Sequence, residues 1–225
     1  MAEAAATKPT LGYWKIRGLA SQIRYELVYL GVEYKEDQYE QGDAPTFDRS
    51  SWLSVKDTLG LQFPNLPYFI DGKMKLTETN AIMKYIAAKY GPELLGTDPV
   101  QIAKVEMVAG VVGDLKGAVT MPCYTSGDRS AITANLLEKV KPIVKFMGEN
   151  DYLVGANPTY VDFTMFELCE LMEFISEGQL FQAQPSLKAY SDRIKGLPKL
   201  AEFYADDARC MKAPFNNKVA KINNI

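Results

Sequence analysis

The chain has 225 residues, of which 47% are hydrophobic, and a formal net charge of −3. This length suits one large domain or two small ones, with enough apolar residues for a core. A pI near 5.2 excludes a typical nucleic-acid binder, which carries a basic surface. No stretch reaches the roughly 20 consecutive apolar residues of a membrane span. The chain has no histidine, which removes the commonest general base and the commonest metal ligand.

The N-terminus and the cysteines bear on the compartment. Residues 1–9 are rich in alanine but lack the long apolar core of a secretory signal, so we expect residues 1–8 to be disordered. The three cysteines, Cys123, Cys169 and Cys210, are far apart and include no Cys-x-x-Cys pair. This spacing predicts neither a disulfide framework nor a zinc site, and it favours a reducing compartment, the cytoplasm.

Strand and helix signals alternate at the start of the chain. Residues 10–14 predict a short strand, and apolar residues recur at helical spacing over 23–30, where Gly31 supplies a C-terminal stop. Residues 34–39 predict a second strand. The polar and aromatic residues 41–56 predict a loop.

A hairpin and a second helix follow this loop. Residues 68–70 predict a strand, and Asp71-Gly72 predicts a tight turn into a further strand at 74–76. Residues 77–79 precede a helix that Gly91-Pro92 stops. The order β-α-β, loop, β-β-α predicts a small mixed sheet with helices.

From Pro99 onward the sequence predicts helices only, so we place a domain boundary between residues 91 and 98. A long helix covers 102–119, although each of its three glycines costs about 1 kcal/mol relative to alanine. A helix over 131–147 should kink or break at Pro142. Three later segments are predicted: a helix opened by a capping box at 159–162, a helix over 185–195, and a polar, irregular tail from residue 208.

Three segments carry long, specific motifs. They are Leu-Gly-Tyr-Trp-x-Ile-Arg-Gly-Leu-Ala at 11–20, Gly-Asp-Ala-Pro-Thr-Phe-Asp-Arg-Ser-Ser-Trp-Leu at 42–53, and Leu-Gly-Leu-Gln-Phe-Pro-Asn-Leu-Pro-Tyr at 59–68. In this order they resemble the cytosolic glutathione transferases, and the second resembles the extra loop of the mu class. The resemblance implies a thioredoxin-like glutathione-binding domain over 9–91, an all-helical domain over 98–225 that contributes the electrophile site, and a cytoplasmic homodimer.

Tyr13 lies where the first strand meets a basic turn, a position from which a phenol can donate a hydrogen bond to an anion. The resemblance assigns it the catalytic role, with the glutathione sulfur as acceptor. A free thiol has a pKa near ~8.5, and lowering it by ~2 units requires about 2.7 kcal/mol. One charge-assisted hydrogen bond supplies roughly 1.5–3 kcal/mol. From the residues alone, a core tyrosine is the alternative.

The resemblance also implies how glutathione is held, without a metal or a prosthetic group. Arg49, Trp52 and Lys56 would bind the glycyl carboxylate; otherwise they are ordinary loop residues. The bond before Pro67 would be cis, with the Leu66 backbone pairing with the cysteinyl part. The implied glutathione-binding residues are Tyr13, Trp14, Arg49, Trp52, Lys56, Asn65, Leu66, Glu78 and Thr79, with Asp114 from the partner subunit.

Glu78-Thr79 opens a helix, and helix N-termini bind anions through their free N–H groups. In the family this site holds the γ-glutamyl carboxylate. The sequence departs here from the commonest mu pair, Gln-Ser. Thr79 keeps the hydroxyl, whereas Glu78 adds a negative charge beside the bound carboxylate, and simple helix capping remains an alternative reading.

Two further sets of residues follow from the resemblance. The second substrate, a small hydrophobic electrophile, would contact Trp14, Leu19, Val111, Tyr124 and Phe215, and the dimer interface would include Phe63 and Lys84.

The function implied is detoxification of xenobiotics, in which the glutathione thiolate is conjugated to a hydrophobic electrophile. Two alternatives remain open. One is a non-catalytic binding or structural protein on the same scaffold, because a fold alone does not fix a function. The other is a glutathione-dependent isomerase or peroxidase, which uses the same thiolate. The sequence does not specify the electrophile.

Overall fold

The computed structural model describes residues 8–211, 214–215 and 218–222. Disorder was predicted for residues 1–8, and residues 1–7 lie outside the described residues. Lys8 is described, and its ammonium forms an ion pair with Glu33 at 2.8 Å.

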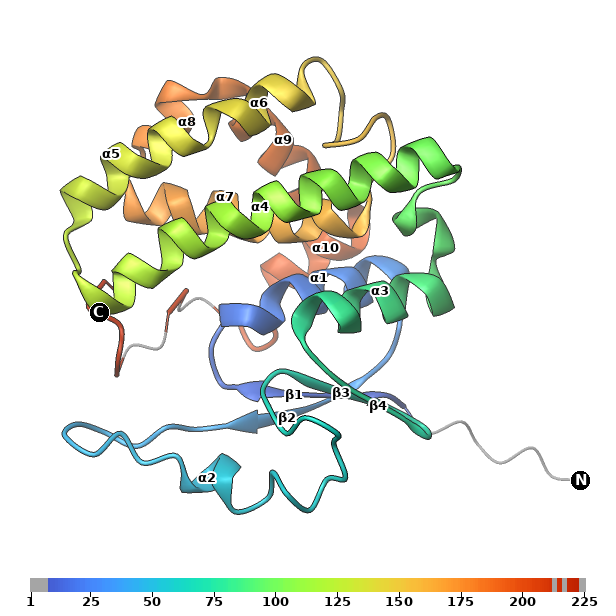
Figure 1. The fold of residues 1–225 in the computed structure, drawn as a ribbon, viewed down its shortest axis with the longest axis vertical. Coiled ribbons are helices and arrows are strands. Elements are labelled where there is room, and N and C mark those ends of the chain that lie inside the picture. Colours follow the sequence, from blue (N-terminus) through green and yellow to red (C-terminus); the bar gives the residue numbers. More distant parts are fainter. Residues whose placement is uncertain (1–7, 212–213, 216–217, 223–225) are drawn as a thin grey trace, which may run out of the picture.

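The N-terminal part is a four-stranded mixed sheet. Strand β1 (Thr10–Trp14) pairs in parallel with β2 (Lys35–Tyr39) and antiparallel with β3 (Tyr68–Asp71), which pairs with β4 (Met74–Thr77). The order across the sheet is β2-β1-β3-β4. Two helices cover one face and the short α2 lies on the other side (Figure 1): α1 is Ser21–Leu30, α2 is Ser50–Leu53 and α3 is Thr79–Tyr90. The predicted mixed sheet is confirmed.

The C-terminal part is helical, as predicted. Helices α1 and α3 lie between the sheet and these helices (Figure 1). Helix α7 is almost entirely buried and forms the centre of this part. The bounds are α4 Pro99–Thr125, α5 Arg129–Lys139, α6 Lys141–Met147, α7 Tyr160–Ile175, α8 Gln179–Ala183, α9 Pro185–Lys195 and α10 Pro198–Ala205. Two short 3-10 turns lie earlier in the chain, at Gly18–Ala20 before α1 and at Pro92–Leu95 before α4. Within the described chain, no helix is both long and apolar enough to cross a bilayer.

Local signals in the sequence set several of these boundaries. The helix predicted over 131–147 breaks before Pro142, which lies in the first turn of α6, where its missing N–H needs no partner. The predicted capping box is present, with Asp162 Oδ2 accepting from the Thr159 amide at 2.7 Å. The predicted cis bond between Leu66 and Pro67 is also present.

Two expectations differ from the structure. The tail after residue 208 is irregular, as predicted, but it is not simply polar surface, because Cys210, Phe215 and Ile222 are buried. Three short helices, α2, α8 and α10, were not predicted. They have four to eight residues, too few to show a clear helical period.

One buried ion pair joins the two parts of the chain. The Arg17 guanidinium, in the turn after β1, binds Glu167 of α7 through two hydrogen bonds of 3.2 and 2.7 Å. The Tyr25 hydroxyl of α1 donates to the same carboxylate at 2.7 Å. Both charged side chains are mostly buried, so each depends on the other for its compensation.

We therefore expect Glu167→Gln to lower the free energy of unfolding by about 3–5 kcal/mol, because it leaves the Arg17 charge buried without a counterion. Replacing both residues by methionine should recover at least half of this loss. Asp192→Asn is the control, since it removes the exposed Lys188–Asp192 pair and should change stability by less than about 1 kcal/mol. Denaturant titration measures all three; equal stability of the Glu167→Gln protein and the parent would contradict this account.

Candidate active site

Tyr13 lies near the carboxyl end of β1, and its side chain is only 5% exposed. Its hydroxyl oxygen accepts a hydrogen bond from the Leu19 amide at 3.0 Å. Among the described residues, no acceptor takes the hydroxyl proton. Burial raises the pKa of Tyr13 to about 12, so the phenol stays neutral and keeps this proton near neutral pH. The site therefore holds a phenol whose O–H is available for an added acceptor.

The turn after β1 leaves room for this hydroxyl because residue 18 is glycine. Gly18 has φ +45°, a conformation that residues with a side chain rarely adopt. A Cβ built there would lie 2.6 Å from the Tyr13 oxygen. The Arg17–Glu167 pair fixes the residue before this glycine, and the Leu19 amide follows it, so one turn holds the phenol in position.

A cavity of about 230 Å³ opens beside Tyr13 and is lined mostly by apolar atoms. It brings together residues from β1, α4, α7 and the C-terminal segment. Three of the predicted second-substrate residues, Leu19, Tyr124 and Phe215, line it. Tyr124 and Phe215 pack edge to face, with ring centroids 5.7 Å apart. This contact holds Phe215 of the C-terminal segment at one side of the cavity.

Two other predicted second-substrate residues do not line this cavity. Successive side chains of a strand point to opposite faces, so Trp14 points away from Tyr13 and packs on Tyr39, with ring centroids 6.5 Å apart. Val111 is 44% exposed on α4. The structure thus separates these two side chains from Leu19, Tyr124 and Phe215.

A second cavity, of about 270 Å³, lies at the N-terminus of α3 and is lined by Glu78 and Thr79. The two cavities adjoin, since Leu19 and Lys116 line both. Glu78 has φ +69°, and strain of this kind costs roughly 1–3 kcal/mol and occurs at ligand sites. The free N–H groups of α3 are suited to an anion here. The Thr79 hydroxyl donates to the Leu19 carbonyl at 3.5 Å and would have to turn toward such a ligand.

The predicted carboxylate-binding loop lies around α2. Trp52 is buried and stacks on Tyr68, with ring centroids 6.0 Å apart and an interplanar angle of 25°. Arg49 is exposed at the N-terminus of α2 and Lys56 is half-buried just after it. Within the described residues, neither cation forms an ion pair with a carboxylate. The three residues do not line the two cavities described above.

The predicted backbone contact at Leu66 already has a partner. The Leu66 amide donates to Asn65 Oδ1 at 2.9 Å. A ligand amide that pairs with the Leu66 backbone would use its carbonyl, or would displace the Asn65 side chain.

The residues predicted at a subunit contact lie on the surface. Phe63 is 70% exposed and Asp114 of α4 is exposed. Lys84 of α3 forms an ion pair with Glu106 at 2.7 Å within the chain.

The sequence reasoning missed Lys116, Gln22 and the Glu167 that holds Arg17. Glu167 and Lys116 line the cavity beside Tyr13, and Lys116 donates to Gln22 Oε1 at 2.9 Å. Position 116 carried one usable signal, since it lies eight residues, just over two helical turns, before Tyr124. Among the described residues, no group of three or more cysteine, aspartate or glutamate side chains could hold a metal ion.

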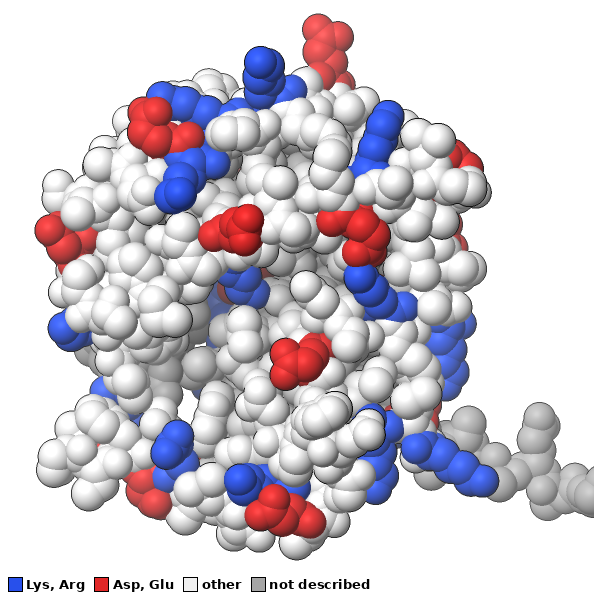
Figure 2. Space-filling model, viewed as in Figure 1, with Lys and Arg blue, Asp and Glu red and all other residues white. Residues whose placement is uncertain are grey.

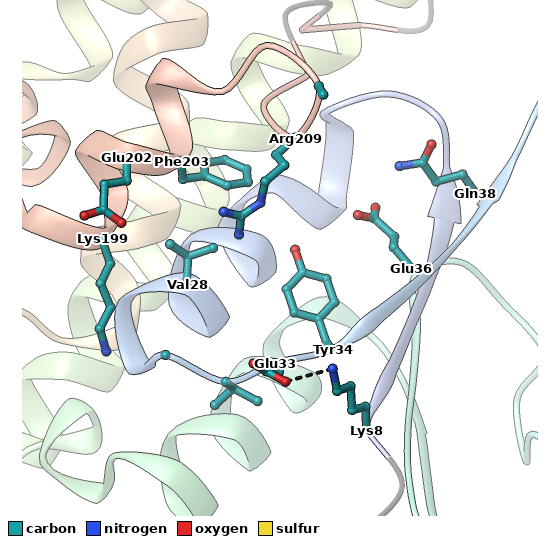
Figure 3. A pocket seen from close by; sticks show the side chains of 13 residues that line it. Lys8, Val28, Glu33, Tyr34, Glu36, Gln38, Lys199, Glu202, Phe203 and Arg209 are labelled. Carbon is teal, nitrogen blue, oxygen red and sulfur yellow. Dashed lines mark ion pairs between the residues drawn. The ribbon is translucent and has the colours of Figure 1, made fainter.

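A larger cavity, of about 510 Å³, lies between β2, the C-terminal end of α1 and α10 (Figure 3). Charged side chains of both signs line it, including Glu36, Lys199 and Arg209. None of the predicted site residues is among them.

Two known domain families together match most of the chain. The glutathione S-transferase N-terminal domain matches residues 9–88, and the glutathione S-transferase C-terminal domain matches residues 122–207. The chain belongs to the glutathione S-transferase family. It is therefore an enzyme of the predicted kind, a transferase with glutathione as its co-substrate, and the predicted thioredoxin-like fold with an all-helical second part is confirmed.

Individual members of the family are similar over almost the whole chain. Glutathione S-transferase Mu 1 of Bos taurus is 40% identical over 95% of this chain and 98% of its own. A glutathione S-transferase of Dermatophagoides pteronyssinus is 39% identical over 88% of this chain and 90% of its own. The crystal structure of the glutathione S-transferase Blo t 8 has a TM-score of 0.82 and 31% identity, covering 96% of this chain and all of that one. The predicted resemblance to the mu class is thus confirmed.

We expect Gly18→Ala to displace the Tyr13 hydroxyl, because its new Cβ would lie within van der Waals distance of the phenol oxygen. The kcat/KM for a model aromatic halide at neutral pH should fall at least about tenfold, as expected for a misplaced hydrogen-bond donor. Gly72→Ala is the matched control: Gly72 also has positive φ, but no atom lies near its Cβ position. Both variants carry the strain of a side chain at positive φ, and Gly18→Ala adds the contact with Tyr13. An equal loss of activity in both would contradict the assigned role of Gly18.

Proposed function

We propose that this protein conjugates the thiolate of glutathione to small hydrophobic electrophiles, and that the Tyr13 hydroxyl stabilises that thiolate. The observation that carries the proposal is the hydrogen-bond pattern of this phenol. Its oxygen accepts from the Leu19 amide, and its proton has no acceptor in the described part of the chain. A sulfur anion placed in the adjoining cavity would complete the pattern.

The chemistry needs a donor rather than a base. Glutathione loses its thiol proton to solvent, and the hydrogen bond from Tyr13 favours the resulting thiolate. The sulfur then attacks an electrophilic carbon, and an aromatic halide loses its halide ion. Because Tyr13 keeps its proton near neutral pH, it acts throughout as the donor. The absence of histidine is therefore no obstacle.

The peptide ends of glutathione are proposed to lie on either side of Tyr13. The γ-glutamyl carboxylate would bind the N-terminus of α3 at Glu78-Thr79, and the glycyl carboxylate would bind Arg49 and Lys56. The two cations are suited to this role because they lack a carboxylate partner among the described residues. Trp52 and Asn65-Leu66 would line the path between the two ends, and Trp14 would contact the peptide from β1.

The second substrate is proposed to occupy the apolar cavity beside Tyr13, against Leu19, Tyr124 and Phe215. Val111, on the exposed side of α4, would contact only the part of a long substrate that leaves this cavity. A glutathione-dependent isomerase or peroxidase would use the same thiolate, and a panel of electrophiles, isomerisable substrates and hydroperoxides distinguishes these reactions.

We further propose a cytoplasmic homodimer, with a glutathione-binding domain over residues 9–91 and a helical domain over 98–225. Phe63, with its exposed ring, would enter the partner subunit, and Asp114 would reach the glutathione ammonium bound by the partner. Lys84 would contribute at the edge of this interface. Two exposed apolar residues on α4, Met107 and Met121, support an interface on the face of this helix that carries Asp114.

Tyr13→Phe tests the central assignment. The pKa of the bound glutathione thiol, followed by thiolate absorbance, should rise by about 1–2 units, because one charge-assisted hydrogen bond is lost. Glutathione affinity should change little. Conjugation of an aromatic halide should fall at least about tenfold at neutral pH and recover as pH rises past the new pKa.

Tyr34→Phe is the control, since it removes a phenol that lines the separate cavity between β2 and α10. A Tyr13→Phe enzyme that conjugates as fast as the parent at neutral pH would refute the assigned role. A parent protein that neither binds immobilised glutathione nor turns over an electrophile would favour the non-catalytic alternative.

Phe63→Ser tests the proposed dimer. We expect the dimer dissociation constant to rise at least about tenfold, as for a buried aromatic anchor, with a parallel loss of glutathione affinity as Asp114 leaves the neighbouring site. Sedimentation at several concentrations measures the first effect and calorimetry the second. Phe146→Ser, at another exposed phenylalanine, should leave the dimer intact. A parent protein that sediments as a monomer would exclude the proposed interface.

A further inference from the structure

Lys116 places a cation in the wall of the second-substrate cavity. It lies on α4, and its side chain lines both the cavity beside Tyr13 and the cavity at the N-terminus of α3. Figure 2 shows that the surface is hollowed beneath α4 on this face. Among the described residues, the Lys116 ammonium has one hydrogen-bond partner, the neutral Gln22 amide oxygen at 2.9 Å, and no carboxylate lies within ion-pairing distance.

The charges around Lys116 compensate it only in part. Glu167 of α7, the carboxylate that lines the same cavity, already holds the Arg17 guanidinium and the Tyr25 hydroxyl. Glu78 lines only the α3 cavity, and Tyr13 and Tyr124 contribute phenols. The cavity beside Tyr13 thus carries one positive charge beyond the Arg17–Glu167 pair. Burial makes this charge unfavourable and lowers the pKa of Lys116 to about 8, although the Glu167 charge opposes the shift.

The polar groups of this wall follow one face of α4. Lys116, Thr120 and Tyr124 are four residues apart, so their side chains lie along the same side of the helix, and all three line the cavity. The Thr120 hydroxyl donates to the Lys116 carbonyl at 2.7 Å, so its proton is not available to a ligand. The ammonium, with three N–H donors and one used by Gln22, retains donors for a ligand.

We propose that Lys116 makes this cavity selective for electrophiles that carry an anionic group, in particular a carboxylate, whose charge it binds on the α4 wall while the reactive carbon faces the sulfur held by Tyr13. The inference rests on the proposed glutathione conjugation and adds the class of second substrate. A carboxylate supplies the counterion that the described residues lack, and a charge-assisted hydrogen bond in a partly desolvated site is stronger than one in water.

The test compares two electrophiles with the same reacting carbon, 4-chloro-3,5-dinitrobenzoate and its methyl ester. The measured quantity is the ratio of kcat/KM for the carboxylate to kcat/KM for the ester, in which differences in thiolate formation cancel. Lys116→Met should lower this ratio about tenfold, through a higher KM for the carboxylate, because it removes the charge and keeps the length of the side chain. Lys116→Arg keeps the charge and should keep most of the ratio.

The pH dependence of the kcat/KM ratio is a second test, which does not need the uncharged Lys116→Met variant. In the parent enzyme the ratio should be high while Lys116 is charged and should fall as pH rises through about 8. The carboxylate stays ionised and the ester stays neutral over this range. With Lys116→Arg the ratio should stay flat, because an arginine keeps its charge. Glu167 stays paired with Arg17 in both proteins, and Tyr13 and Tyr124 line the cavity in both, so these groups affect the parent and Lys116→Arg alike.

The outcomes are distinct. A parent enzyme that conjugates neither compound contradicts the proposed function itself. If both compounds react but the ratio changes less than about twofold in Lys116→Met and with pH, the selectivity is refuted. An equal loss for both compounds in Lys116→Met also refutes it, since Lys116 would then act on the thiolate or on the fold, and the ultraviolet absorbance of bound thiolate distinguishes these two.

Discussion

The buried carboxylate of Glu167 is the constraint on which the site depends. It holds Arg17 and Tyr25, so it ties the turn after β1 and the middle of α1 to the central helix of the C-terminal part. That turn carries the Leu19 amide, which orients the Tyr13 hydroxyl. A side chain from one half of the chain therefore fixes the geometry of the proposed catalytic group in the other. The Arg17–Glu167 pair contributes little to net stability, because the cost of burying two charges offsets much of their attraction. Its main effect is to fix the position of the turn.

Orientation also explains why a buried phenol suits this chemistry. Burial alone would make Tyr13 a poorer acid, and its pKa is raised to about 12. A general base with such a pKa would be useless at neutral pH, but a hydrogen-bond donor needs only to keep its proton and point it correctly. The Leu19 amide occupies the phenol oxygen, and Gly18 leaves space for it. In the proposed reaction the site thus stabilises a thiolate whose proton has passed to solvent.

Much of the fold could be predicted from the sequence, because its signals are local. The Asp71-Gly72 turn, the break before Pro142 and the capping box at Thr159 each depend on a few neighbouring residues, and each is present in the structure. Contacts between distant segments were not predictable in this way. The burial of Phe215 against Tyr124, the pairing of Glu167 with Arg17 and the position of Lys116 depend on how α7 packs against α4 and α1. The separation of Trp14 from Tyr13 follows from strand alternation, but the resemblance to a family carried no such geometry.

Helix α4 lines the cavity with one face, exposes apolar and acidic residues on the other, and contains three glycines that lower its intrinsic stability. Its inner face supplies Lys116 and Tyr124 to the cavity, whereas its outer face exposes Met107, Met121 and Asp114. Its glycines at 110, 113 and 117 have open space at the Cβ position, so no close packing among the described residues explains them. Each costs about 1 kcal/mol relative to alanine. Gly113 lines the cavity at the N-terminus of α3, where a side chain would reduce the space for a ligand. At that position the helix gives up intrinsic stability to keep one wall of the proposed glutathione site open.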